Sequence, residues 1–120
     1  VADRCDALHP AVLGLVRAVV EAGRATDTPV ALCGEMAADV SAVPILLGFG
    51  LDTLSVAPSS LPTVARLVRK VDRSAAEGLA TTACAAPDAE TVRRRAQEWL
   101  HEHVDADGGD FGTLPPPKAE

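Results

Sequence analysis

The sequence predicts an α/β fold in which helices cover a parallel sheet. Segments with apolar residues at helical spacing alternate with two short apolar runs, Pro29 to Cys33 and Leu51 to Val56. Strands that are apolar throughout are typical of parallel sheets buried on both faces. Because two strands alone do not make a stable sheet, the pattern indicates a slice of a larger architecture.

The first helix is predicted to begin at His9-Pro10, because proline suits the first position of a helix. We expect Gly23 to end this helix. After the first strand, Asp39 is expected to cap a helix that has Pro44 in its first turn. The apolar face of the first helix is predicted from its spacing and comprises Val12, Leu13, Val16, Val19 and Val20.

A turn bounded by the glycines at 48 and 50 leads into the second strand. A helix with Pro62 near its start follows this strand. Two further helices are predicted over residues 74–84 and 88–103, and Asp88 caps the second. The buried face of the Pro62 helix is predicted to contain Val64, Leu67, Val68 and Val71.

The end of the sequence is rich in charge, glycine and proline. The run Arg93-Arg94-Arg95 is interpreted as a solvated helix face. Residues 105–120 contain Gly108-Gly109 and three consecutive prolines, which predicts a disordered tail. The folded domain is therefore predicted to span residues 1–104.

The composition argues against several classes of function. Eleven basic residues against seventeen acidic ones give a net charge of -6, which disfavours nucleic-acid binding. No apolar run reaches about 18 residues, so no membrane insertion is expected. The three cysteines, Cys5, Cys33 and Cys84, are an odd number at wide spacing, which favours a reduced, cytoplasmic setting over a disulfide framework.

Cys33 is the residue whose setting most suggests chemistry. It ends a predicted strand and is followed by Gly34, the acid Glu35 and a helix. Ligands of parallel α/β folds bind at that end of the strands, and the start of a helix favours a thiolate. Such a thiol can donate or accept a proton. The residues alone leave open that Cys33 is a small buried apolar side chain.

The surrounding sequence resembles a known family. The run Leu32-Cys33-Gly34-Glu35-Met36-Ala37, followed by Asp39 and residues 46–52, resembles the C-terminal part of enzyme I. Enzyme I is the phosphoenolpyruvate-protein phosphotransferase of the bacterial sugar phosphotransferase system. The resemblance includes Ala2-Asp3-Arg4 and His9-Pro10 upstream, and covers about the first 100 residues.

Pyruvate phosphate dikinase and phosphoenolpyruvate synthase share the Cys33-Gly34 pair. Met36-Ala37 and the residues around Leu61-Pro62 resemble enzyme I more closely. The resemblance implies the C-terminal portion of a (β/α)8 TIM barrel, incomplete as a barrel by itself. Pro29 to Cys33 would be its seventh strand and Thr53 to Val56 its eighth.

The resemblance also implies roles for three residues. Cys33 would be the proton donor to the enolate that forms when phosphoenolpyruvate loses its phosphoryl group to a histidine. Arg4 would bind the phosphate of phosphoenolpyruvate, because a guanidinium group matches phosphate geometry. Without the resemblance, Arg4 beside Asp3 would be a surface ion pair. Glu35 would orient the cysteine loop, or alternatively would only stabilise a helix N-terminus as an acid.

The complete enzyme is expected to use Mg²⁺, to phosphorylate the phosphocarrier protein HPr and to form a homodimer. No residue here can be assigned as a metal ligand or as the phosphorylated histidine, so the chain alone is expected to be inactive. Two alternatives stay open. The chain is a stand-alone remnant that serves as a self-associating binding module, or it is a fragment of a pyruvate phosphate dikinase or phosphoenolpyruvate synthase. Ala38, where enzyme I commonly has glycine, is a departure from the family pattern.

Overall fold

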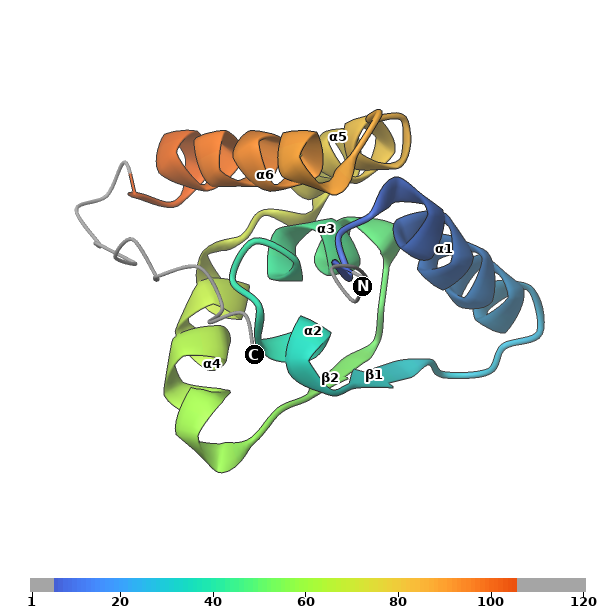
Figure 1. Ribbon diagram of the computed structural model, residues 1–120. Coiled ribbons are helices and arrows are strands. Elements are labelled where there is room, and N and C mark those ends of the chain that lie inside the picture. The colour runs from blue at the N-terminus through green and yellow to red at the C-terminus, as the bar shows by residue number, and fades with distance from the viewer. Residues whose placement is uncertain (1–5, 106–120) are drawn as a thin grey trace.

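The computed structural model describes residues 6–105 of the 120-residue chain (Figure 1). Part of the predicted 1–104 domain and nearly all of the predicted tail lie outside these residues, so both stay predictions. The elements follow one another in the order α1 (Pro10–Ala25), β1 (Ala31–Cys33), α2 (Glu35–Ala38), α3 (Val43–Phe49), β2 (Thr53–Ser55), a 3₁₀ turn η1 (Pro58–Ser60), α4 (Leu61–Lys70), α5 (Arg73–Cys84) and α6 (Ala89–His103).

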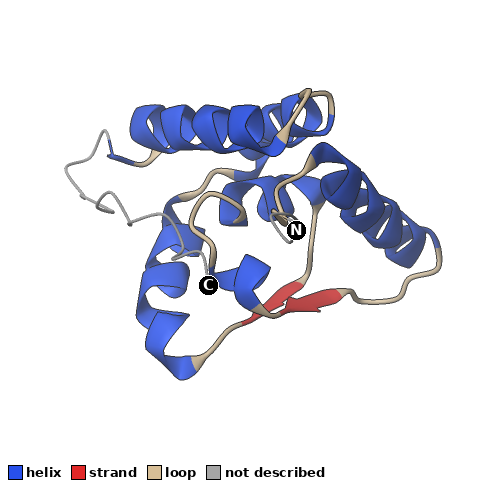
Figure 2. Ribbon diagram, viewed as in Figure 1, coloured by secondary structure: helices blue, strands red, loops and turns tan. Residues whose placement is uncertain are grey.

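The two strands pair in parallel, as the alternation of helices and apolar runs predicts. Figure 2 shows the strand pair together at one edge of the molecule, while helices make up most of the rest. The predicted α/β class is therefore confirmed. The register pairs Ala31 with Thr53, Leu32 with Leu54, and Cys33 with Ser55.

The prediction that both faces of these strands are buried is wrong for this chain. Leu32 and Leu54, the middle residues, are half-buried and pack against the core. Their neighbours along each strand are exposed. Side chains alternate between the two faces of a strand, and the sheet has no third strand within residues 6–105.

Helix α3 forms the centre of the core, and Figure 1 shows it between α1, α5 and α6. Five of its seven residues are buried. It packs most extensively against α5, and the two helices approach closely at Gly48, where a Cβ atom would collide with the carbonyl oxygen of Ala76. Gly48 thus lies inside α3 rather than in a turn. Gly50 instead ends the helix, with a φ of 90° that suits glycine.

Helix α1 also differs from its prediction, because it continues past Gly23 to Ala25. Gly23 is buried, and a Cβ atom there would lie 2.5 Å from Val30 Cγ2 and 2.7 Å from the carbonyl oxygen of Thr28. This glycine therefore allows the loop after α1 to pass close to the helix. Two predicted core residues are exposed, Val19 by 57% and Val68 by 39%, so both apolar faces are narrower than predicted.

The predicted helix starts are largely confirmed. Pro10, Pro44 and Pro62 each lie in the first two positions of a helix. Asp88 caps α6, because its Oδ1 accepts a hydrogen bond of 2.7 Å from the backbone N–H of Thr91. None of the helices within residues 6–105 is both long and apolar enough to cross a membrane.

Candidate active site

Cys33 is the last residue of β1, and its side chain is exposed. It lies on the face of the sheet opposite to Leu32, which packs against the helices. Within residues 6–105, Cys33 is therefore not a buried apolar side chain. Ser55, its partner at the end of β2, is also exposed and was not assigned a role from the sequence. The carboxyl end of the strand pair thus presents a thiol and a hydroxyl side by side.

Gly34 redirects the chain immediately after the thiol. Its φ of 96° and ψ of −170° lie in a region that glycine alone adopts readily. A Cβ atom at Gly34 would meet nothing within 4 Å, so the backbone angle and not packing requires glycine here.

The helix expected after the thiol, α2, is a single turn of four residues. A turn this short has a small dipole, so it supports the predicted effect of a helix N-terminus on the thiol only weakly. Ala37 is fully buried and anchors the turn to the core. Glu35 is exposed in its first position, and its orienting role stays a prediction.

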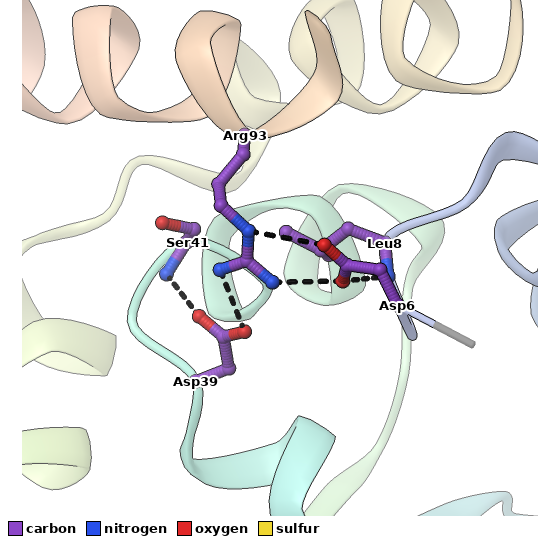
Figure 3. A network of polar contacts seen from close by, with 5 residues as sticks. All are labelled: Asp6, Leu8, Asp39, Ser41 and Arg93. Carbon is purple, nitrogen blue, oxygen red and sulfur yellow. Dashed lines mark hydrogen bonds and ion pairs between the residues drawn. The ribbon is translucent and has the colours of Figure 1, made fainter. Parts of the chain in front are cut away.

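A polar network joins the segment after α2 to the beginning of the described chain (Figure 3). Arg93 of α6 binds Asp6 with two hydrogen bonds, from Nη2 to Oδ1 at 2.8 Å and from Nε to Oδ2 at 3.3 Å. Its other terminal nitrogen, Nη1, donates to Asp39 Oδ2 at 3.1 Å. The two carboxylates also accept from the backbone N–H groups of Leu8 and Ser41, each at 3.0 Å. We call these five residues the Arg93 network.

The contacts in this network shift the pKa values of Asp6 and Arg93. Partial burial acts to raise the pKa of Asp6, but the hydrogen bonds from Arg93 and from Leu8 N–H, with the Arg93 charge, hold that pKa below its ordinary value. Burial acts to lower the pKa of Arg93, and the two carboxylates outweigh it and raise that pKa. Both partners are thus stabilised in their charged forms.

The interpretation of Arg93-Arg94-Arg95 as a solvated face is wrong for Arg93. Arg93 is half-buried in the network, and Arg95 donates to the carbonyl oxygen of Thr82 at 3.2 Å. Only Arg94 of the run is exposed. A signal was present, because Arg93 lies three and seven residues before Ala96 and Leu100, which are buried.

Asp39 does not cap α3 as predicted, since that helix begins at Val43 with no side-chain cap. Its Oδ1 binds Ser41 N–H, and its carbonyl oxygen accepts from Ala42 N–H and Val43 N–H at 2.9 and 3.1 Å. Asp39 therefore organises the turn that joins α2 to α3.

Arg4 lies outside the described residues, so its predicted phosphate contact is not tested. It precedes Asp6 by two positions in the sequence. Within residues 6–105, no three His, Cys, Asp or Glu side chains lie close enough to hold a metal ion. The described residues therefore do not fit a Mg²⁺ site.

A cavity of about 390 Å³ lies between β2 and α4, away from Cys33. Its walls are mainly apolar and include Leu54, Val64 and Val68. Its charged side chains, Asp52 and Arg69, are not joined to Cys33 or to the Arg93 network. The lining of this cavity therefore contains neither Cys33 nor a residue of the Arg93 network.

Comparison with known proteins agrees with this arrangement. Residues 1–73 match the family of the PEP-utilising enzyme, PEP-binding domain. The chain is 38% identical over 96 residues to the phosphoenolpyruvate-protein phosphotransferase of Haemophilus influenzae, which covers 80% of the chain and 17% of that protein. It is 37% identical over 91 residues to that of Staphylococcus carnosus, which covers 76% and 16%. It is also 37% identical over 92 residues to the multiphosphoryl transfer protein of Xanthomonas campestris, which covers 77% and 11%.

The chain spans less than a fifth of the length of these relatives. Its two parallel strands and their helices are part of a TIM-barrel domain and do not form a closed barrel. The chain belongs to the family of PEP-utilising enzymes and contains part of their PEP-binding domain.

Proposed function

We propose that this chain forms part of the active site of a phosphoenolpyruvate-protein phosphotransferase, in which Cys33 is the proton donor. The observation that supports this role is the exposed thiol at the carboxyl end of β1, on the face of the sheet turned away from the core. Active sites of TIM-barrel enzymes form at that end of the strands. The relatives above are named as phosphoryl-transfer proteins, and two of the three as using phosphoenolpyruvate.

The proposed reaction has two parts. A histidine nitrogen bonds to the phosphorus of phosphoenolpyruvate while the bond from phosphorus to the enol oxygen breaks, which leaves an enolate. The electron pair of the enolate then takes the proton of the Cys33 thiol at the terminal carbon. Pyruvate and a thiolate result, and solvent returns the proton to sulfur. Proton delivery by a positioned acid contributes about 10²- to 10⁴-fold in rate.

Arg4 would bind the phosphate group, and Glu35 would orient the loop around the thiol. When Mg²⁺ is bound in a complete phosphotransferase, it supplies positive charge beside the phosphoryl group. Its ligands, like the phosphorylated histidine, are assigned to no described residue of this chain. The enzyme would pass the phosphoryl group to the phosphocarrier protein HPr, act in the cytoplasm and form a homodimer.

Because the Mg²⁺ ligands and the phosphorylated histidine are assigned to no described residue, we expect purified 120-residue protein not to release pyruvate from phosphoenolpyruvate. A coupled pyruvate assay with Mg²⁺ tests this. Robust Mg²⁺-dependent turnover by the chain alone would show that its own residues are sufficient and would contradict the assignment of the other groups to a larger protein.

The role of Cys33 is tested in a complete phosphotransferase that contains these residues. A substrate with a methyl group on the terminal carbon of phosphoenolpyruvate gives a chiral product when the reaction is run in D₂O. An acid on one face gives one enantiomer, whereas solvent protonates both faces. Cys33→Ala is expected to give a racemic product at a rate lowered by about 10²- to 10⁴-fold. Cys84→Ala is the matched control. A single enantiomer at normal rate from Cys33→Ala would refute the proposal.

A further inference from the structure

We propose that Arg93 is a positioning residue for the proton donor, because it binds both Asp6 and Asp39 and so holds the segment that follows the Cys33 loop. This proposal rests on the proposed function of Cys33. Arg93 lies on α6, and its guanidinium group joins Asp6, near the start of the chain, to Asp39, which follows the cysteine loop (Figure 3). The two carboxylates are 33 residues apart in the sequence, and α1, β1 and α2 separate them.

The contact with Asp6 holds the first described residues of the chain. Asp6 Oδ1 accepts both from Arg93 Nη2 at 2.8 Å and from Leu8 N–H at 3.0 Å. Leu8 is fully buried in the core. Asp6 is therefore fixed between the core and α6.

The contact with Asp39 holds the far end of the cysteine loop. The N–H of Asp39 donates to the carbonyl oxygen of Met36 at 3.2 Å, which closes the single turn of α2. Cys33 and Gly34 directly precede that turn. With β1 at one end of the loop and Arg93 at the other, the thiol segment has fixed points on both sides.

Arginine is suited to this bridge because its planar group donates in several fixed directions. One edge of the guanidinium group binds Asp6 with two bonds, and the remaining nitrogen binds Asp39. The Arg93 and Asp39 side chains are each 24% exposed, so solvent screens this pair less than a surface pair. A lysine ammonium group is a single point charge and cannot reproduce the fork.

The first test measures amide hydrogen exchange on the 120-residue chain and does not depend on activity. Arg93→Gln is expected to raise exchange about 10-fold at Leu8 and Ser41, whose N–H groups bind the two carboxylates. Arg93→Lys should restore protection at only one of the two. Arg94→Gln, an exposed neighbour on the same helix, should change neither. Normal exchange at Leu8 and Ser41 in Arg93→Gln would overturn the proposal. An equal rise in exchange throughout α5 in that variant would also overturn it.

The second test uses the chiral substrate in a complete phosphotransferase that contains these residues. If Arg93 positions the thiol against the substrate, Arg93→Gln should yield a mixture of enantiomers, Arg93→Lys an intermediate excess and Arg94→Gln a single enantiomer. Loss of folded protein alone would lower the rate without changing the enantiomeric ratio. A single enantiomer from Arg93→Gln, with a racemic product from Cys33→Ala, would refute the role of Arg93 alone. A single enantiomer from Cys33→Ala would refute the proposed function itself.

Discussion

The close approach of α3 and α5 predicts that Gly48 cannot be replaced by alanine without cost. A Cβ atom at Gly48 would collide with the carbonyl oxygen of Ala76, and would lie 2.8 Å from its carbonyl carbon and 2.9 Å from Ala80 Cβ. Two of these three atoms belong to the backbone of α5, so no side-chain rotation relieves the contact. The helices must separate at the centre of the core, where α3 is almost entirely buried.

Overpacking of a core typically costs about 1–3 kcal/mol. Alanine recovers about 0.5–1 kcal/mol over glycine inside a helix. Gly48→Ala is therefore expected to lower the free energy of unfolding by up to about 2.5 kcal/mol. Gly78→Ala is the matched control, because Gly78 lies inside α5 and a Cβ atom there meets nothing within 4 Å. That variant should gain about 0.5–1 kcal/mol.

Urea unfolding of both variants, followed by circular dichroism, measures the difference directly. The midpoints should shift in opposite directions with similar slopes. If Gly48→Ala proved as stabilising as Gly78→Ala, the close packing of α3 on α5 would be wrong. The inference that α3 holds the Asp39 turn firmly against the core would then fail as well.

Two further predictions concern charged groups. Because the folded pKa of Asp6 lies below its ordinary value of 3.8, its ionised form adds stability above that pH, which is lost as the pH falls through the folded pKa. Asp6→Asn should remove this part of the acid-side loss in a pH series of Tm values, and an unchanged series would contradict the pairing with Arg93. Asp72→Ala should cost about 1 kcal/mol by urea unfolding, since Asp72 Oδ1 accepts from Ala75 N–H and caps α5. Asp72→Asn should keep most of that stability, and equal losses in both variants would argue against the cap.

Local patterns predicted the elements of this fold that depend on neighbouring residues. The proline at the start of α1, the Asp88 cap and the position of Cys33 at the end of β1 follow from short sequence signals. The extent of α1 did not follow, because glycine at position 23 is required by close contact with Thr28 and Val30 and does not mark the end of the helix. Likewise, the exposure of one face of the strands did not follow, because an apolar run does not report how many strands the sheet has within residues 6–105.

The Arg93 network shows why part of the site was missed. Its partners lie 87 and 54 residues away in the sequence, and periodicity within one helix does not report such distances. A run of three arginines predicts a solvated helix face, because three consecutive charged residues hide the spacing of the apolar residues around them. The position of Arg93 at the edge of the buried stripe of α6 was the remaining signal.

The proposed role of Cys33 requires an open thiol next to bound substrate. Iodoacetamide labelling of a complete phosphotransferase that contains these residues, followed by mass spectrometry, compares Cys33 with Cys84. Cys33 is exposed, whereas burial raises the pKa of the half-buried Cys84, so Cys33 should react faster. Phosphoenolpyruvate should slow the labelling of Cys33 and leave that of Cys84 unchanged. Equal labelling of the two cysteines, or a rate at Cys33 that phosphoenolpyruvate does not alter, would contradict the placement of this thiol at the substrate.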